Sequence, residues 1–477
     1  MQRFGIVRGP SRRRARGQAL IWLLGTMATA VAVLYGVFNV AQLTAGKAKV
    51  VNAADAAALA GATSEARMLN LMAYNNRAVM ANEVLLVQMV SLESWLGYVS
   101  NTGIHIGEVL SLIPPLEPLA AIIMDAGNAA QTVRDDVLDP AVDVTTAFVE
   151  VLKTGLAAAH LAVSTLGGGV AVDAANSIVA ANRADFGTHK DNGVQMASGA
   201  VMAMTSVRAA WDWSQFTRQY TANDRKYAKQ VLEDSRDGFS ANRPGNALFN
   251  IDLGLAGMEK HGGTRLHDFD RWEAQDTLEM WSKHPCKEGL CKDYLPIGWG
   301  RATVDKDGNA GEAWKNPDRP VVDLAMSEAK NHKNWSGVPE LFDIRNRDKA
   351  ARATLGIDFS VAVTRAQGSN MTTQNLGMQK AHLNSVTGSA EMNERLQGDQ
   401  LASLARARVS FERPVAGLAK DWTAGALVRP DAAKEYGSLY SPFWQARLTD
   451  IPLGEKSGFY GLMGINPLLA PTTPGGQ

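Results

Sequence analysis

A run of 25 residues without a charged side chain, 19–43, constrains this chain more than any other feature. At 1.5 Å per residue, a helix of this length crosses roughly 30 Å of hydrocarbon with a small tilt. The apolar core of a cleaved secretory signal is shorter, at about 7 to 15 residues. The sequence therefore predicts a transmembrane anchor over residues 18–43 that stays attached to the chain.

Charges on either side of the anchor predict its orientation. Residues 1–17 contain six arginines and no acidic residue, whereas only Lys47 and Lys49 follow the anchor closely. The positive-inside rule places such an arginine-rich tail in the cytoplasm and the rest of the chain outside. The other apolar stretches contain prolines or charges, so we expect one span. The prediction is a single-pass membrane protein with its N-terminal tail in the cytoplasm and its bulk outside.

Composition excludes several classes of protein. The chain has 48 basic and 48 acidic residues, and without the arginines of the tail the remainder carries a net charge of −6. This balance argues against a dedicated nucleic-acid binder. Two cysteines are too few for a disulfide scaffold or for the four thiolates of an iron–sulfur cluster. We expect no cofactor.

The pattern beyond the anchor predicts a mainly α protein with a distal α+β part. Residues 44–237 are rich in alanine and show apolar residues at helical spacing, which indicates a long helical stalk and closely packed helical hairpins. Near Gly238 alanine becomes rarer and turn residues become more frequent, so we expect a small antiparallel-sheet domain over 238–465 and a flexible tail over 466–477. The expected strands are 298–304, 358–365, 407–413 and 439–448, with a helix over 391–406.

Two groups of helical residues have both a functional and a structural interpretation. Ala28, Ala32 and Gly36 lie four residues apart, a spacing that lets another transmembrane helix approach closely but that also follows from ordinary alanine content. The second group either docks a partner protein or forms the polar face of the stalk helix. It comprises Asn76, Arg77, Asn82 and Glu83.

Residue pairs that suggest chemistry have weak signatures. Cys286 and Cys291 enclose four residues, which favours a local disulfide over a redox Cys-x-x-Cys motif. Ser327 and Lys330 fit the Ser-x-x-Lys pattern of penicillin-binding enzymes, but so short a pattern occurs by chance in a chain of this length. We therefore predict no catalytic residues.

Histidines and acidic residues between 261 and 284 match no established zinc spacing. The run from Asp305 to Asn309 departs from the pattern of a calcium-binding loop and indicates a hairpin turn instead. We predict no metal site from these spacings. The histidine-rich group comprises His261, His267, Asp268, Asp270 and His284.

Two blocks of sequence resemble the N-terminal part of TadG-like proteins of the Tad (Flp-type) pilus-assembly system. The first is the Arg-Gly-Gln-Ala-Leu block that ends at Leu20, and the second is Asn-Ala-Ala-Asp-Ala-Ala-Ala-Leu-Ala-Gly-Ala over residues 52–62. Related pilins are cut after a glycine and carry a glutamate at the fifth mature position. Here a cut between Gly17 and Gln18 would place Trp22 there, so processing stays open.

The resemblance implies an accessory role in pilus assembly and a location in a bacterial inner membrane, with the bulk of the chain in the periplasm. Many TadG-like proteins also end in a von Willebrand A domain, whose metal motif Asp-x-Ser-x-Ser is incomplete here because Ala362 replaces the second serine after Asp358 and Ser360. We expect a non-enzymatic protein that binds other Tad or Flp pilus or secretion components. A membrane-anchored surface or adhesion protein and, less favoured, a periplasmic cell-wall hydrolase are the alternatives.

Overall fold

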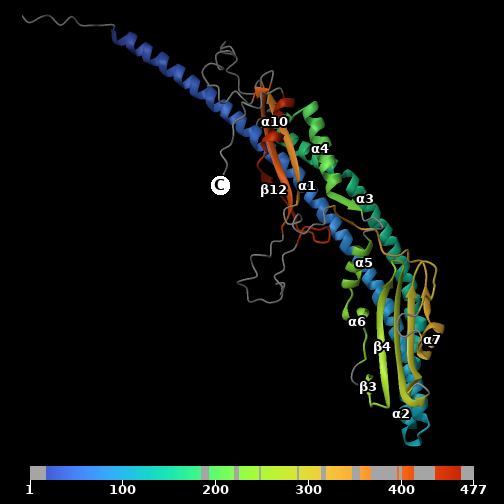
Figure 1. Cartoon of the computed structure of the whole chain (residues 1–477). Coiled ribbons are helices and arrows are strands. Elements are labelled where there is room, and N and C mark those ends of the chain that lie inside the picture. Colours follow the sequence, from blue (N-terminus) through green and yellow to red (C-terminus); the bar gives the residue numbers. More distant parts are fainter. Residues whose placement is uncertain are drawn as a thin grey trace, which may run out of the picture.

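One uninterrupted helix, α1 (Gln18–Ser111), organises the chain. It has 94 residues, which corresponds to about 140 Å. The computed structural model describes residues 18–183, 193–219, 225–245, 249–286, 289–312, 318–345, 355–366, 395–396, 400–412 and 436–463. The predicted continuation of the anchor into a stalk is confirmed, because α1 runs through both (Figure 1). The predicted tails 1–17 and 466–477 lie outside the described residues.

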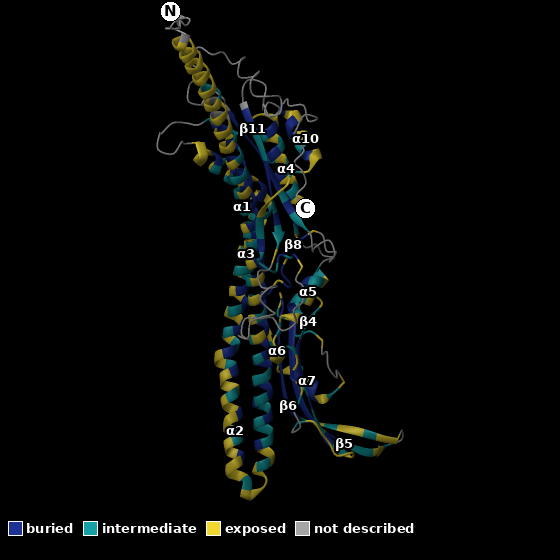
Figure 2. Ribbon diagram, turned by 90° about the vertical axis from the view of Figure 1, so that its left-hand side faces the viewer, coloured by how far each residue is buried: buried dark blue, intermediate teal, exposed yellow. Residues whose placement is uncertain are grey.

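The first turns of α1 are exposed on all sides (Figure 2). The stretch Ala19–Phe38 is long and apolar enough to cross a membrane and fits the predicted anchor. Residues Pro114–Arg183 meet the same criteria of length and hydropathy. This second stretch packs along α1, is only partly buried, and contains the buried charged side chain of Arg134.

The chain turns at Pro114 and Pro115 and returns along α1. The return consists of η1 (Pro114–Leu116), α2 (Glu117–Thr132), the π-helix η2 (Val133–Leu138) and α3 (Asp139–Arg183). The hairpin is closely packed, as predicted: a Cβ atom on Gly127 would lie 2.9 Å from the backbone oxygen of Ser100. Gly167 and Gly168 lie inside α3, where Trp213 and the backbone of a neighbouring helix press against them.

Two antiparallel sheets pack along α1. The anchor-side sheet contains, in spatial order, β1 (Val194–Met196), β9 (Gly356–Ala366), β11 (Gln400–Phe411) and β10 (Arg395–Leu396), and β12 (Trp444–Thr449) also pairs with β11. Its core includes Leu69 of α1, Phe359 of β9 and Val409 of β11. Helices α4 (Ala200–Phe216) and α10 (Leu453–Leu462) pack nearby, α4 on α3 and β9 and α10 on α4.

The tip-side sheet lies further from the anchor. It is built from β3 (Ile251–Asp252), β4 (Ala256–His267), β5 (Arg271–Cys286), β6 (Gly289–Val304) and β7 (Lys330–His332), and only β7 runs parallel to its neighbour β6. Its core joins Leu86 of α1 to Trp272 and Trp335. The remaining elements are β2 (Thr217–Gln219), which pairs with β8 (Phe342–Ile344), and the short helices α5 (Arg225–Asp234), α6 (Gly238–Ala241) and α7 (Pro320–Ser327).

The fold class is confirmed, but several local expectations are wrong. The sheets do not form a distal domain after residue 238: both lie along the helical stalk, and strands β1 and β2 precede that boundary (Figure 1). The helix expected over 391–406 is absent, since β10 and much of β11 occupy its described residues. The sequence there contains good helix formers, yet pairing with β9 decides the outcome. The expected strands 298–304 and 358–365 lie inside β6 and β9.

The close contact between α1 and β9 predicts the effect of a methyl group at Gly61. A Cβ atom there would collide with the ring of Phe359, whereas one on Gly155 of α3 meets nothing within 4 Å. We expect Gly61→Ala to destabilise the protein by about 1–3 kcal/mol through overpacking. Gly155→Ala should instead stabilise it by about 0.5–1 kcal/mol, because alanine favours a helix. Urea unfolding in detergent measures both, and a stabilised Gly61→Ala variant would contradict the packing.

Candidate functional site

Polar side chains of α1 face the body of the protein instead of solvent. We call this set the polar seam. Each member is buried or half-buried and bonds to the part of the chain that follows residue 260. The members are Asn70, Asn76, Glu83, Ser91, Glu93, Ser94 and Asn101. The members extend over 32 residues of one helix, from Asn70 to Asn101. Their partners lie in both sheets, so the seam runs along the anchor-side and the tip-side sheet.

The asparagines of the seam pair with backbone groups. The side-chain amide of Asn70 makes two hydrogen bonds with the backbone of Trp444, each 3.0 Å long. Its Oδ1 accepts from the N–H of Trp444, and its Nδ2 donates to the carbonyl oxygen of Trp444. Nδ2 of Asn76 donates to the carbonyl oxygens of Phe342, at 2.7 Å, and Leu439, at 2.6 Å. Both residues therefore bind the C-terminal half of the chain to the stalk at one register.

The predicted docking group is mostly internal. Asn76 and Glu83 are 0% exposed, so they are not available to a partner. Arg77 is exposed, and its Nε donates to the carbonyl oxygen of Tyr440, while Asn82 is half-buried. The docking interpretation is therefore wrong for Asn76 and Glu83. These residues do form a polar face of α1, but the C-terminal half of the same chain covers that face.

Glu83 is a buried carboxylate of the stalk helix, and it faces the loop that contains Trp335. Its Oε2 accepts a 3.0 Å hydrogen bond from the indole N–H of Trp335, and the ammonium of Lys153 lies 3.9 Å from Oε1. Burial raises the pKa of Glu83 to about 7, although the Lys153 charge and the Trp335 bond oppose that shift. Glu83 is thus an ionisable group that titrates near neutral pH inside the core.

Ser94 connects the seam to a buried ion cluster in the tip-side sheet. Its hydroxyl donates to Oδ2 of Asp276 at 2.8 Å. The same carboxylate pairs with Arg243 at 2.8 Å and Lys260 at 3.3 Å. All the charges in this cluster have partners, which indicates a structural role.

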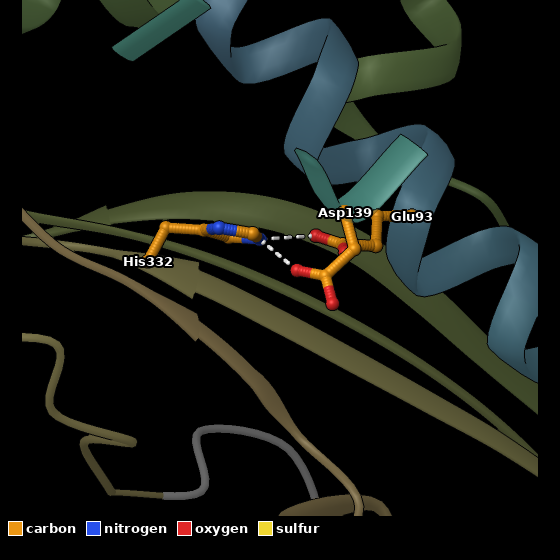
Figure 3. Close-up of side chains that lie close together, drawn as sticks. All are labelled: Glu93, Asp139 and His332. Carbon is orange, nitrogen blue, oxygen red and sulfur yellow. Dashed lines mark hydrogen bonds and ion pairs between the residues drawn. The ribbon is translucent and has the colours of Figure 1, made fainter. Parts of the chain in front are cut away.

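The charged junction lies where α1, α3 and β7 meet. Nε2 of His332 is 2.7 Å from Oε2 of Glu93 and 3.8 Å from Oδ1 of Asp139, and Figure 3 shows both carboxylates facing the ring. Nδ1 lies 2.9 Å from Oδ1 of Asp143, and Lys330 pairs with Asp139 at 2.8 Å. Burial favours a lower pKa for His332, but hydrogen bonds and charges from Glu93 and Asp143 outweigh it and raise that pKa.

The sequence contained no motif for this junction. Residues 93 and 332 are 239 positions apart, and the acids of α3 come from a third element. The only local signal was the pair of acidic residues one turn apart, Asp139 and Asp143, directly after the π-helix η2. Short π-helical segments occur frequently at functional sites.

The remaining predicted residues lie apart from the junction. Cys286 and Cys291 form a disulfide beside the β5–β6 turn. Ala28, Ala32 and Gly36 lie on the anchor part of α1, where no described residue lies within 4 Å of the position of a Gly36 Cβ. Gly17, of the Gly17–Gln18 junction, is outside the described residues.

Of the two short patterns weighed for chemistry, one contributes Lys330 to the junction, but neither forms the site that its pattern suggested. The hydroxyl of Ser327 donates to the carbonyl oxygen of Leu324, and Lys330 pairs with Asp135 and Asp139, so neither bond joins serine to lysine. Asp305 accepts from the backbone N–H groups of residues 307 and 309 and closes a turn. The turn leads from β6 toward α7, so the expected hairpin is wrong.

Asn76 provides the first test of the polar seam. Removing its amide leaves two buried carbonyl oxygens without their donor, so we expect Asn76→Ala to cost about 2–4 kcal/mol of stability. Asn82→Ala is the matched control, because Asn82 is half-buried and has no side-chain hydrogen bond among the described residues. It should change stability by only about 0.5 kcal/mol. Equal urea midpoints for the two variants would contradict the role of the seam.

Glu83 predicts a pH dependence of stability. An acid whose pKa is higher in the folded than in the unfolded state contributes stability that is present below the unfolded pKa and is lost as pH rises through the folded value. With a folded pKa of about 7, stability falls between about pH 4.5 and pH 7, by about 3 kcal/mol in total. Glu83→Gln should remove this slope.

The measurement is the urea midpoint at several pH values for wild type, Glu83→Gln and Glu108→Gln. Glu108 lies exposed on the same helix, so its variant should follow the wild type. The difference between wild type and Glu83→Gln isolates the contribution of Glu83 from those of other groups. Parallel curves for these two proteins would show that Glu83 does not titrate in this range.

Comparison with known proteins bears on the first part of α1. The family model Tad, described as "Putative Flp pilus-assembly TadE/G-like", matches residues 17–64. No curated protein and no solved structure matches the chain. The matched segment covers the exposed anchor and the beginning of the contact between α1 and the anchor-side sheet. The resemblance to the TadG-like family is therefore confirmed over this N-terminal segment, which is similar to the Tad family of putative Flp pilus-assembly proteins.

Proposed function

We propose that this protein is a membrane-anchored, non-enzymatic accessory component of Tad/Flp-type pilus assembly or secretion, which acts by binding other components in the periplasm. The observation that carries the proposal is the position of the Tad match. Residues 17–64 contain both the apolar anchor and the first part of α1 that packs on a sheet. Because α1 is one helix, the Tad segment and the body of the protein form one continuous rod.

The charge distribution supports the orientation in this proposal. Six arginines precede the anchor, so the positive-inside rule keeps the N-terminal tail in the cytoplasm. The disulfide between Cys286 and Cys291 fits an oxidising compartment such as the periplasm. Both arguments support the proposed location of the sheets and the helical hairpin on the periplasmic side of an inner membrane.

An exposed apolar surface on the returning helices supports action by binding. The outward side of η2 and α3 carries large apolar residues spaced by seven, four and three positions, and we call them the outer stripe. They are Val137, Val144, Phe148 and Val151. Contiguous exposed apolar surface is typical of a site of protein interaction. Steps of seven, four and three residues follow a heptad-type pattern, which suits contact with another helix.

The alternatives have less support. A cell-wall hydrolase needs an activated nucleophile, and the hydroxyl of Ser327 bonds to its own helix, whereas Lys330 pairs with acidic residues of η2 and α3. A surface or adhesion protein would share the anchor and the exposed stripe. The Tad match favours pilus assembly over adhesion.

Crosslinking in cells tests the proposal. A C-terminally tagged chain is crosslinked, captured after membrane solubilisation and examined by mass spectrometry, beside a version with an unrelated anchor and a Phe148→Glu variant. We expect pilins or other Tad inner-membrane components in the wild-type sample. Their recovery should fall several-fold in both altered chains, and Asn128→Glu, an exposed change on α2, should leave it unchanged.

Recovery of outer-envelope or wall-associated proteins alone would contradict the pilus role. Unchanged recovery with the unrelated anchor would show that the Tad segment does not provide the contact. Unchanged recovery with Phe148→Glu would show that the outer stripe is not part of the binding surface.

A further inference from the structure

The charged junction has more acidic than basic side chains among the residues that the structure describes. Within this part of the chain, four carboxylates approach two basic side chains, Lys330 and His332, within hydrogen-bonding or ion-pair distance. The four acids are Glu93, Asp135, Asp139 and Asp143. Uncompensated negative charge close to a buried group is costly, so the junction favours an added cation.

A buried oxygen at the junction lacks a partner. Glu93 is 0% exposed, and its Oε2 is the atom that faces His332. Its second oxygen, Oε1, has no hydrogen-bond partner among the described residues. Buried carboxylate oxygens without a hydrogen bond are rare, and a missing ion is one of the common reasons. This observation is independent of the charge imbalance.

The ring of His332 is oriented as in a metal ligand. Oδ1 of Asp143 lies 2.9 Å from Nδ1 and can accept a hydrogen bond from the N–H of that nitrogen. A carboxylate in this position fixes the tautomer of a metal-bound imidazole and directs the lone pair of Nε2 toward the ion. Nε2 faces the carboxylate oxygens of Glu93 and Asp139, so three ligand atoms converge from α1, α3 and β7 (Figure 3).

We propose that Glu93, Asp139 and His332 bind one divalent transition-metal ion of the Zn²⁺ class. Two carboxylates and one imidazole form a ligand set that zinc accepts, and nitrogen ligation disfavours Mg²⁺ and Ca²⁺. A neutral imidazole is required, so a proton leaves the ring as the ion binds. Asp143 is a positioning residue, and Lys330 holds the second oxygen of Asp139.

Access and effect follow from the burial of the ligands. Glu93 and His332 are buried, but the side chain of Asp139 is 31% exposed and that of Asp143 is 64% exposed, so an ion can enter from the surface of α3. Once bound, the ion connects the stalk helix, the returning helix and the tip-side sheet. The inference is independent of the proposed role in pilus assembly.

A second histidine with two carboxylates provides a matched control. Glu259, His261 and Glu279 also place their ligand atoms close together. There, however, Arg319 pairs with both carboxylates and Lys292 pairs with Glu259. Because cations of the chain already neutralise this group, we expect no metal binding at His261.

The test measures zinc binding to the full chain in detergent. The protein is stripped with EDTA, titrated with ZnCl₂ by calorimetry, and analysed for bound zinc after gel filtration. We expect one Zn²⁺ per wild-type chain. His332→Gln should abolish it, Asp139→Asn should weaken it at least tenfold, and Asp143→Asn should weaken it by about 10–100-fold. His261→Gln should retain the wild-type affinity.

Thermal melting keeps the result interpretable if a buried variant folds poorly. ZnCl₂ should raise the melting temperature of wild type and His261→Gln by more than that of Asp139→Asn, whose altered side chain is partly exposed. Absence of retained zinc in the wild type would overturn the proposal. Equal zinc retention by wild type, His332→Gln and Asp139→Asn would overturn it as well, because the ion would then bind elsewhere.

Discussion

The structure depends on α1 serving two environments as a single helix. In lipid, a helix satisfies its own backbone groups, so the anchor needs only apolar side chains. Beyond the anchor the same helix buries one side against two sheets, and there it carries the polar seam. An alanine-rich surface alone would allow a sheet to slide along the helix. Hydrogen bonds such as those of Asn70 and Asn76 form at one register only, and they fix where each sheet lies.

The two sheets contact the stalk by different means. Near the anchor, alanines and Gly61 bring α1 close to the ring of Phe359, so contact depends on the absence of side-chain volume. Toward the tip, large rings such as Trp272 and Trp335 fill the core, and buried acids of α1 bond to the sheet and to the loop beside it. The tip-side contact is therefore polar and sensitive to charge, whereas the anchor-side contact is sensitive to volume.

This arrangement gives the proposed functions separate locations. The Tad segment occupies the anchor end of α1, the outer stripe lies on the returning helix, and the charged junction connects that helix to the stalk and the tip-side sheet. A partner bound to the outer stripe would contact α3, which supplies two carboxylates of the junction. One continuous helix, α1, thus connects the apolar anchor segment to the part of the chain that carries the proposed binding surface.

The sequence alone determined the anchor, the long stalk helix, the helical hairpin, the strands around 300 and 360, and the Tad resemblance. Each of these follows from local composition or spacing, which the chain carries wherever it folds. Tertiary structure decided the rest. Residues 400–406 became a strand because β9 pairs with them, and Asn76 and Glu83 became internal because the C-terminal half covers that face. The charged junction joins residues up to 239 positions apart, and no local pattern can indicate a contact that only packing creates.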